Sequence, residues 1–373
     1  MIVLKRLELK LNMCYKLKNK MIQMPSEFEK NLDKYAEVIV KIGLNLQPRQ
    51  RLLIGAPTIG INGVTLELAP LVRLIAKKAY QIGAKLVDVM WEDDQVSLYR
   101  YKYAPKDSFE EYPTWRTDGV FNIAKESDAM LLVVARNPDL LSEEDSNLIF
   151  AIHKAYLNYG KPSNDLRRRG LVNWLAITAP VDGWAEKIFP NIPEEERKAK
   201  FWDILFDICR IKHDDPVSAW KDHISQLVSR CSYLNNKKYN ALHFSSPGTD
   251  LTIGLPEGHI WKSAHFTTQG GISNVVNIPT EEIFTTPHKD KTEGTVTTTK
   301  PLFSDVLIED LSLTFSKGKV KEFSATKGEE YIRKIIKTDE GASRLGEVSL
   351  VPNSSPISQT GLLFYSILID ENA

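Results

Sequence analysis

Residues 251–300 hold the densest group of side chains that could bind a metal or move a proton. Short apolar or β-branched runs alternate there with Gly and Pro turns, which is typical of β-hairpins and exposed loops. Divalent cations take oxygen and nitrogen donors, so carboxylates and imidazoles on such material indicate a candidate metal site. The alternative is that they are ordinary polar residues on solvated hairpins. The side chains concerned are Glu257, His259, His265, Glu281, Glu282, His288, Asp290 and Glu293.

Two glutamates stand where an apolar run begins or ends. Glu347 comes directly before the apolar run 348–351, and Glu281 follows the run 277–279. An acid in such a place is costly to bury unless a cation, a lysine or solvent compensates its charge. Two carboxylates at strand ends could bridge two divalent ions and activate a shared water molecule. That arrangement would make the protein a hydrolase.

The elements that must position these residues divide into two expected domains, because 373 residues exceed one typical core. We predict an α/β domain over residues 26–236, in which strands alternate with helices as parallel βαβ units. Ser26 and Glu29 have the spacing of a capping box and begin its first helix. The strands are expected at 51–56, 86–91, 129–135 and 171–178, and the helices at 26–43, 65–82, 143–159, 193–209 and 216–234.

The second expected domain is strand-rich α+β and covers residues 237–373. The polar run 235–238 marks the junction between the two domains. One helix is expected at 329–337, and the run 361–369 is read as a core strand with a helix as the alternative. The other strands are expected at 241–244, 250–254, 259–262, 306–308, 312–316, 320–324 and 345–351.

Composition narrows the class of protein. Lys+Arg and Asp+Glu are equal at 48 each, so no net field recruits nucleic acid or an anionic membrane. Three widely spaced cysteines, Cys14, Cys209 and Cys231, suit a reducing compartment, and no run is long and apolar enough for a membrane helix. We therefore expect a cytoplasmic protein. Residues 1–25 form a basic N-terminal extension, which could be an amphipathic membrane-touching helix but reads better as an appended segment.

Other catalytic or nucleotide-binding motifs are weak. Gly55, Gly60 and Gly63 lie between a strand and a helix, where backbone amides can hold phosphate, but they match neither dinucleotide nor P-loop spacing. A plain loop is the better interpretation, and nucleotide binding remains a third option. No G-x-S-x-G motif and no local signature around a cysteine support a serine or cysteine hydrolase.

Several segments together resemble the aminopeptidase T family of metallopeptidases, also called the aminopeptidase S family. They read LPEGHIW, NIPTEEIFTTPHKD, GTVTTTKPL, IEDLSLTF, DEGASRLGEVSLVP, SSPIS and DENA, and the likeness runs from about Phe28 to Ala373. The resemblance implies an exopeptidase that removes N-terminal amino acids from peptides with two divalent ions, cobalt, zinc or magnesium. It also implies a homodimer of two-domain subunits with an enclosed active site.

The family's metal ligands are two glutamates, two histidines and an aspartate. The resemblance places one glutamate at Glu281, in the PTEE segment, and the other at Glu347, in the LGE segment. Glu282 is the alternative if the register differs by one residue, and none of His259, His265 or His288 matches a family ligand. The general base stays open among Glu281, Glu282 and Glu347.

This sequence ends at Ala373, whereas family members continue beyond the DENA segment to the remaining ligands. We therefore expect a C-terminally incomplete metal-site domain with two of the five ligands. Two hypotheses follow. The chain is a metal-dependent aminopeptidase, or it is a catalytically inactive, truncated remnant that retains at most dimerisation or peptide binding.

Overall fold

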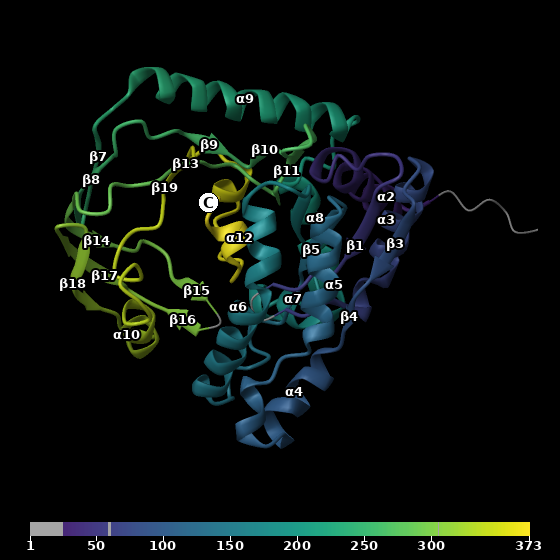
Figure 1. Cartoon of the computed structure of the whole chain (residues 1–373), viewed down its shortest axis with the longest axis horizontal. Coiled ribbons are helices and arrows are strands. Elements are labelled where there is room, and N and C mark those ends of the chain that lie inside the picture. Colours follow the sequence, from purple (N-terminus) through teal and green to yellow (C-terminus); the bar gives the residue numbers. More distant parts are fainter. Residues whose placement is uncertain (1–24, 59–60, 305) are drawn as a thin grey trace, which may run out of the picture.

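A parallel five-stranded sheet forms the centre of the first half of the molecule (Figure 1). The computed structural model describes residues 25–58, 61–304 and 306–373, so the predicted extension over residues 1–25 lies almost wholly outside it. The strand order is β12–β6–β5–β1–β3, and every neighbouring pair is parallel. Its strands are β1 (Arg51–Ile54), β3 (Leu86–Val89), β5 (Ala129–Val134), β6 (Trp174–Thr178) and β12 (Asn277–Ile278).

Helices cover this sheet, which confirms the predicted α/β class. Strand β5 is apolar along its length and almost wholly buried, as expected of a strand covered on both faces. The first helix, α2, begins with the predicted capping box, in which Ser26 and Glu29 exchange bonds with each other's backbone amides. The helices are α2 (Glu27–Val38), α3 (Ala69–Gln81), α4 (Asp94–Tyr103), α5 (Thr114–Lys125), α6 (Ser146–Arg168), α7 (Asp182–Ile188), α8 (Glu194–Ile208) and α9 (Pro216–Lys237).

The second half is strand-rich, also as predicted. An antiparallel five-stranded sheet has the order β18–β17–β14–β8–β7, and a three-stranded sheet has the order β19–β13–β9. These strands are β7 (Ala241–Ser246), β8 (Thr249–Gly254), β9 (Lys262–Ser263), β13 (Ile283–Thr285), β14 (Thr292–Thr297), β17 (Ser312–Ser316), β18 (Lys319–Ser324) and β19 (Val348–Leu350). The remaining elements are the pairs β10 (His265–Thr267)–β11 (Ser273–Val275) and β15 (Leu302–Ser304)–β16 (Val306–Ile308), with α10 (Glu329–Ile336), α11 (Pro356–Thr360) and α12 (Ile367–Asp370).

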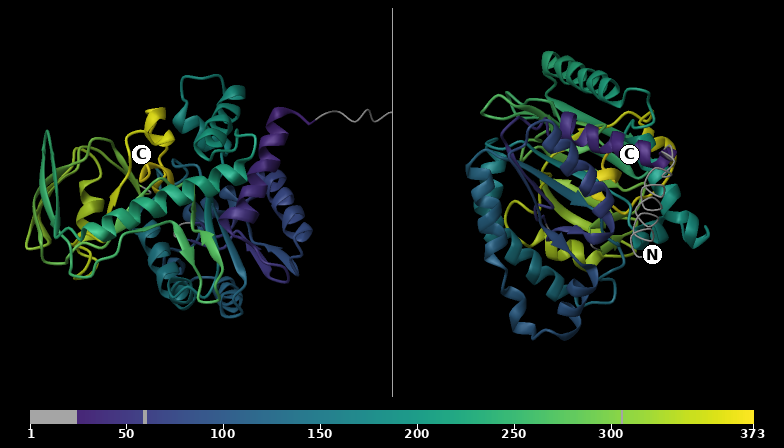
Figure 2. Two further views of the ribbon diagram at one scale, coloured as in Figure 1. Left: turned by 90° about the horizontal axis from the view of Figure 1, so that it is seen from above. Right: turned by 90° about the vertical axis from the view of Figure 1, so that its right-hand side faces the viewer.

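Two segments from beyond residue 237 join the first half. Strand β12 pairs with β6 at the edge of the parallel sheet. Ile357, Phe364 and Ile369 are buried in the same core cluster as residues of α2, α3 and α8. Helix α12 accordingly lies between the two halves, while α9 runs alongside both (Figures 1 and 2). No helix among the described residues is both long and apolar enough to cross a membrane.

The sequence analysis did not predict helices α4, α5 and α7, and it misread residues 361–369. Helix α4 has no buried residue, so it lacks the apolar periodicity that would reveal it. Residues 361–369 form a turn and α12 instead of the predicted core strand. Both Gly361 and Tyr365 have positive φ there, 65° and 56°, which no strand can accommodate.

The loop after β1 approaches the segment after β3 very closely. Gly55 has φ 79°, and a Cβ there would collide with the carbonyl oxygen of Met90. A Cβ on Gly63 would lie 2.8 Å from the same oxygen. Close packing therefore explains why glycine occupies these two positions, without a role in phosphate binding.

Replacing Gly55 should destabilise the protein. The left-handed conformation alone costs about 1–2 kcal/mol for Gly55→Ala, and the collision with Met90 adds to it. Gly119→Ala in α5 is the matched control, because its Cβ would meet only a methyl group at 3.6 Å. Urea unfolding of both variants measures the difference, and an equal stability for the two would contradict the packing argument.

Candidate metal centre

The predicted acids lie at the start of two paired strands. Glu281 and Glu282 immediately precede β13, and Glu347 immediately precedes β19. These strands pair antiparallel, with Phe284 opposite Ser349. Because side chains alternate along a strand, Glu282 falls on the face of Phe284 and Ser349, and so does Glu347. Glu281 falls on the opposite face.

Burial and mutual repulsion distinguish the acids on the Glu282 face. The pKa of Glu282 is raised to about 7, chiefly by burial, with a hydrogen bond to the Ser349 side chain opposing the rise and the charge of Glu347 adding to it. Burial likewise raises the pKa of Glu371 to about 8, with Glu282 and Glu347 adding to the effect. Glu371 follows α12 directly, so three carboxylates from three separate segments repel one another here.

Glu281 is neutralised by a different set of residues. It is 3% exposed, and the Nη1 atom of Arg210 lies 2.6 Å from its Oε1. Arg210 also lies 3.1 Å from Nδ1 of His223, whose Nε2 lies 2.8 Å from the carbonyl oxygen of Thr280. The Nε2 atom must donate to that carbonyl, so Nδ1 accepts from Arg210 and the ring is neutral. Burial, followed by the nearby Arg210, lowers the pKa of His223 in agreement with this tautomer.

The sequence-based pair of Glu281 and Glu347 stays a prediction. Antiparallel pairing puts Glu281 and Glu282 at one end of the β13–β19 pair and Glu347 at the other. Glu282, the alternative register, lies on the same face of the strands as Glu347, because neighbouring residues in extended chain face opposite ways. The charges of Glu282 and Glu347 also act on Glu371. The sequence analysis missed Glu371, because this residue approaches the other acids only when the C-terminal segment folds back. The one sequence feature that could have indicated it is its position at the end of an apolar run.

The other expected ligands stay on their hairpins. The Nδ1 atom of His288 accepts from the amide of Asp290, and Asp290 is ion-paired with Arg344. Glu293 accepts a bond from the amide of Lys317. His259 has its Nδ1 3.0 Å from the carbonyl oxygen of Pro256. Local contacts thus account for His288, Asp290 and Glu293, while the buried Nε2 of His259 has no hydrogen-bond partner among the described residues.

The carboxylate group on the Glu282 face fits a divalent cation in its chemistry. The Oε2 atom of Glu282 is buried and has no hydrogen-bond partner among the described residues. An unpartnered buried oxygen beside two further acids is stabilised by a positive charge, and hard cations prefer oxygen ligands. Within the described part of the chain, however, no three His, Cys, Asp or Glu side chains stand close enough together to hold an ion.

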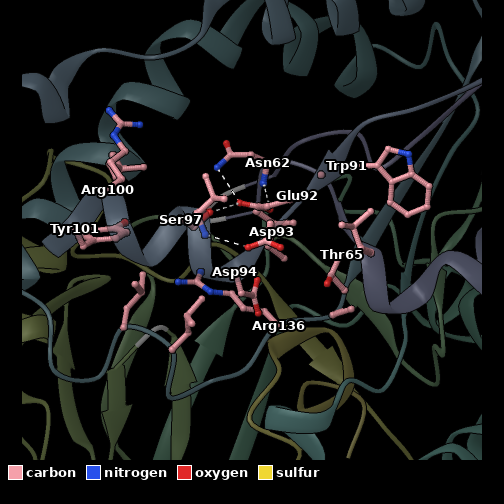
Figure 3. A pocket seen from close by; sticks show the side chains of 18 of the residues that line it. Asn62, Thr65, Trp91, Glu92, Asp93, Asp94, Ser97, Arg100, Tyr101 and Arg136 are labelled. Atoms are coloured by element: carbon pink, nitrogen blue, oxygen red, sulfur yellow. Dashed lines mark hydrogen bonds between the residues drawn. The ribbon is translucent and has the colours of Figure 1, made fainter. Parts of the chain in front are cut away.

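A separate cavity of about 450 Å³ opens at the carboxyl ends of β1, β3 and β5 (Figure 3). Ligands of α/β sheets bind at this edge. Glu92 accepts from the amide of Asn62 at 2.7 Å and from the Ser97 hydroxyl at 3.0 Å, and Asp93 caps α4. Asp94 lies beside Arg136, and burial followed by the charge of Glu92 raises the pKa of Asp94. The cavity is lined by three acids, Glu92, Asp93 and Asp94, and by three arginines, Arg100, Arg116 and Arg136, so the charges of its wall are balanced.

Glu281→Gln should destabilise the folded protein strongly. The substitution leaves the guanidinium of Arg210 buried without its counter-charge, which costs about 3–5 kcal/mol. Asp250→Asn removes the exposed pair with His243 and should cost no more than about 1 kcal/mol. Guanidinium unfolding compares them, and a small loss for Glu281→Gln would show that the pair is not a structural support.

The metal-free protein should become less stable as the pH rises through neutrality. Because the pKa values of Glu282 and Glu371 are raised to about 7 and about 8, the folded state holds more protons than the unfolded state between pH 4.5 and these values. The free energy of unfolding therefore falls as the pH rises across that window. Calorimetry in chelator from pH 5 to pH 9 measures the slope. The double variant Glu282→Gln, Glu371→Gln should flatten it, and an unchanged slope would contradict the assignment.

Comparison with known proteins agrees with this architecture. The family model described as thermophilic metalloprotease (M29) matches residues 28–373. Aminopeptidase 2 of Geobacillus stearothermophilus is 43% identical over 353 residues, and aminopeptidase T of Thermus thermophilus is 38% identical over 347 residues. Each match covers 93% of this chain and 83% of the relative.

A solved structure extends the likeness to three dimensions. Wild-type AmpT from Thermus thermophilus superposes with a TM-score of 0.85 at 36% sequence identity, covering 93% of this chain and 84% of that one. The parallel sheet and the strand-rich half are thus common to both proteins. The chain belongs to the thermophilic metalloprotease (M29) family and is a metal-dependent peptidase.

Proposed function

We propose that the chain is an aminopeptidase that releases N-terminal amino acids from peptides by metal-dependent hydrolysis. The names of the relatives support the exopeptidase activity. The observation that carries the proposal is the buried Oε2 of Glu282, which has no hydrogen-bond partner among the described residues, while the charge of Glu347 acts on Glu282 and the charges of both act on Glu371. A site that concentrates uncompensated negative charge in the interior is suited to a cation, and a cation at a peptidase site has a direct chemical use.

Glu282, Glu347 and Glu371 are the proposed ligands of two divalent ions, cobalt, zinc or magnesium, and these three side chains would have to move closer together to hold an ion, since the described residues contain no such three-ligand cluster. Bound ions of this kind polarise a carbonyl group and make a water molecule more acidic. Glu281 is excluded from this ligand set, because Arg210 already neutralises it on the other face. The sequence-based pair Glu281 and Glu347 thus becomes Glu282 and Glu347, joined by Glu371.

Binding of a cation at this site requires Glu282 and Glu371 to lose their protons. Glu282 and Glu371 hold protons near neutral pH without a cation, and they must release them before their carboxylates can bind one. Metal affinity should therefore rise with pH. The amide of Glu282 donates to Oδ1 of Asn372 at 3.1 Å, which fixes the backbone of this carboxylate relative to the neighbouring Glu371.

The family resemblance also supports a homodimer that acts on peptides in the cytoplasm. The described cysteines, Cys209 and Cys231, are free thiols, which suits a reducing compartment. The balanced charge of the sequence gives no general attraction to nucleic acid.

One observation favours a second candidate function. The described residues provide no three-ligand cluster, and two or three carboxylates alone bind metal more weakly than a full ligand set. The second candidate is therefore a chain that binds peptides or dimerises without hydrolysing them.

The two candidates differ in turnover and in their response to substitution. Hydrolysis of leucine p-nitroanilide with added Co²⁺ or Zn²⁺ should be abolished by chelator, and Glu282→Gln, Glu347→Gln or Glu371→Gln should each lower kcat/KM by at least about 100-fold. Under the second candidate, the wild-type chain binds a dipeptide in calorimetry but releases no nitroaniline with any metal.

Glu281→Gln makes the same substitution at the adjacent acid, and because it is expected to destabilise the fold, its activity is referred to the folded fraction. The fraction that remains folded should keep its metal dependence. Loss of metal dependence in Glu281→Gln together with its retention in Glu282→Gln would reverse the assignment of the two faces.

A further inference from the structure

A second, largely apolar cavity of about 270 Å³ lies between the parallel sheet and the C-terminal segment. One side is formed by the residues after β5, another by Trp184 of α7, and a third by residues 365–368. Strand β15 contributes the ring of Phe303. Its principal apolar lining is Ile61, Val134, Leu141, Trp184, Phe303 and Ile367, and its polar lining includes Arg136, Thr58 and Ser366.

The wall at Tyr365 is held in an unusual conformation. Tyr365 has φ 56°, a value that large side chains rarely adopt. The carboxylate of Asp370 accepts from the amide of Phe364 at 2.8 Å and from the amide of Ser366 at 2.9 Å, so it clamps the backbone on both sides. Trp184 Nε1 donates to the carbonyl oxygen of Phe364 at 2.5 Å. Strained residues held by their surroundings cluster at ligand sites.

The Tyr365 ring is fixed as well. It packs edge-to-face on Phe303, with ring centroids 6.0 Å apart, and Lys187 Nζ lies 5.1 Å from its centroid.

Ser366 is 6% exposed and lines the cavity, and its hydroxyl oxygen has no hydrogen-bond partner among the described residues. A buried hydroxyl without a partner at a cavity wall indicates that a polar group of a ligand completes it.

The same short segment carries the carboxylate group. Ile367 and Glu371 are four residues apart along α12, which corresponds to about 6 Å of helix. Asn372 then accepts bonds from the amides of Glu281 and Glu282, at 2.7 Å and 3.1 Å. The apolar cavity and the candidate metal ligands are therefore two parts of one rigid unit.

We propose that this cavity is the specificity pocket of the peptidase and takes a large apolar side chain of the peptide. The inference rests on the proposed function, because it assigns the substrate class of that same site. The aromatic and aliphatic walls match such a side chain, and the Ser366 hydroxyl is available to the polar backbone beside it. Hydrophobic pockets discriminate side-chain size by about 10–200-fold in kcat/KM, so leucine and phenylalanine substrates should exceed alanine substrates by such a factor.

Narrowing the pocket tests the assignment. Ile367→Phe adds a ring at a wall position that is 57% exposed and so can change without disturbing the core. The ratio of kcat/KM for leucine p-nitroanilide to that for alanine p-nitroanilide should fall at least tenfold. Val228→Phe, on the exposed surface of α9, is the control and should leave the ratio as in the wild type. An unchanged ratio in Ile367→Phe would overturn the proposal.

A binding measurement separates failure of the pocket from failure of the proposed function. Calorimetry with L-phenylalaninamide requires no turnover, and Ile367→Phe should weaken its binding at least tenfold. If the wild type hydrolyses nothing but this loss is seen, the proposed activity fails and the pocket stands. If turnover is normal and neither binding nor selectivity changes, the pocket fails and the activity stands.

A widening variant provides the second measurement should Ile367→Phe fold poorly. Tyr365→Gly removes the ring and suits the positive φ, so the backbone is not strained. Selectivity should then shift at least tenfold from leucine toward tryptophan p-nitroanilide. The same selectivity as the wild type in this variant would overturn the proposal.

Discussion

The side-chain oxygen of Asn372 holds the two halves of the candidate site together. It accepts hydrogen bonds from the amides of Glu281 and Glu282, and Asn372 is fully buried. Its own carbonyl oxygen accepts from the hydroxyl of Ser355, and its Nδ2 donates to the carbonyl oxygen of Leu368. This one amide therefore links the start of β13 to α12. The position of Glu371 relative to Glu282 depends on that link.

Two adjacent buried acids show how a protein can compensate a charge in different ways. Glu281 has a guanidinium at 2.6 Å and a neutral histidine behind it, so its charge is balanced within the chain. In the part of the chain that the structure describes, the groups that act on Glu282 are the Ser349 side chain and the acid Glu347, with no cation among them. Burying both without compensation would be very costly, because isolated charges lose most of their hydration in the interior. The contrast between the two faces, more than any single distance, is the physical case for a metal at Glu282.

Much of the architecture could be predicted from the sequence. The apolar strands and the intervening helices of the first half give clear periodic signals, and the capping box at Ser26 appears as expected. Helix α4 gave no such signal, because none of its residues is buried. The run 361–369 was misread as a strand, because its composition is apolar while its conformation is set by the clamp from Asp370.

The candidate site was only partly accessible to sequence reasoning. The two glutamates of the TEE segment are chemically identical, and only the pairing of β13 with β19 and the contact with Arg210 tell them apart. Arg210 is distant in sequence and carries no motif. Glu371 enters the group through the return of the C-terminal segment, which is a property of the whole fold. Local sequence thus indicated the type of site, and the choice among its members depends on contacts that only the folded chain makes.

The most direct test of this account is the position of the metal itself. A crystal of the protein grown with Co²⁺ and measured at the cobalt absorption edge gives an anomalous difference map that locates the ion without reference to activity. The account predicts a peak within coordination distance of the carboxylates of Glu282, Glu347 and Glu371. A peak beside Glu281, or a well-ordered site with no peak near Glu282, would contradict it.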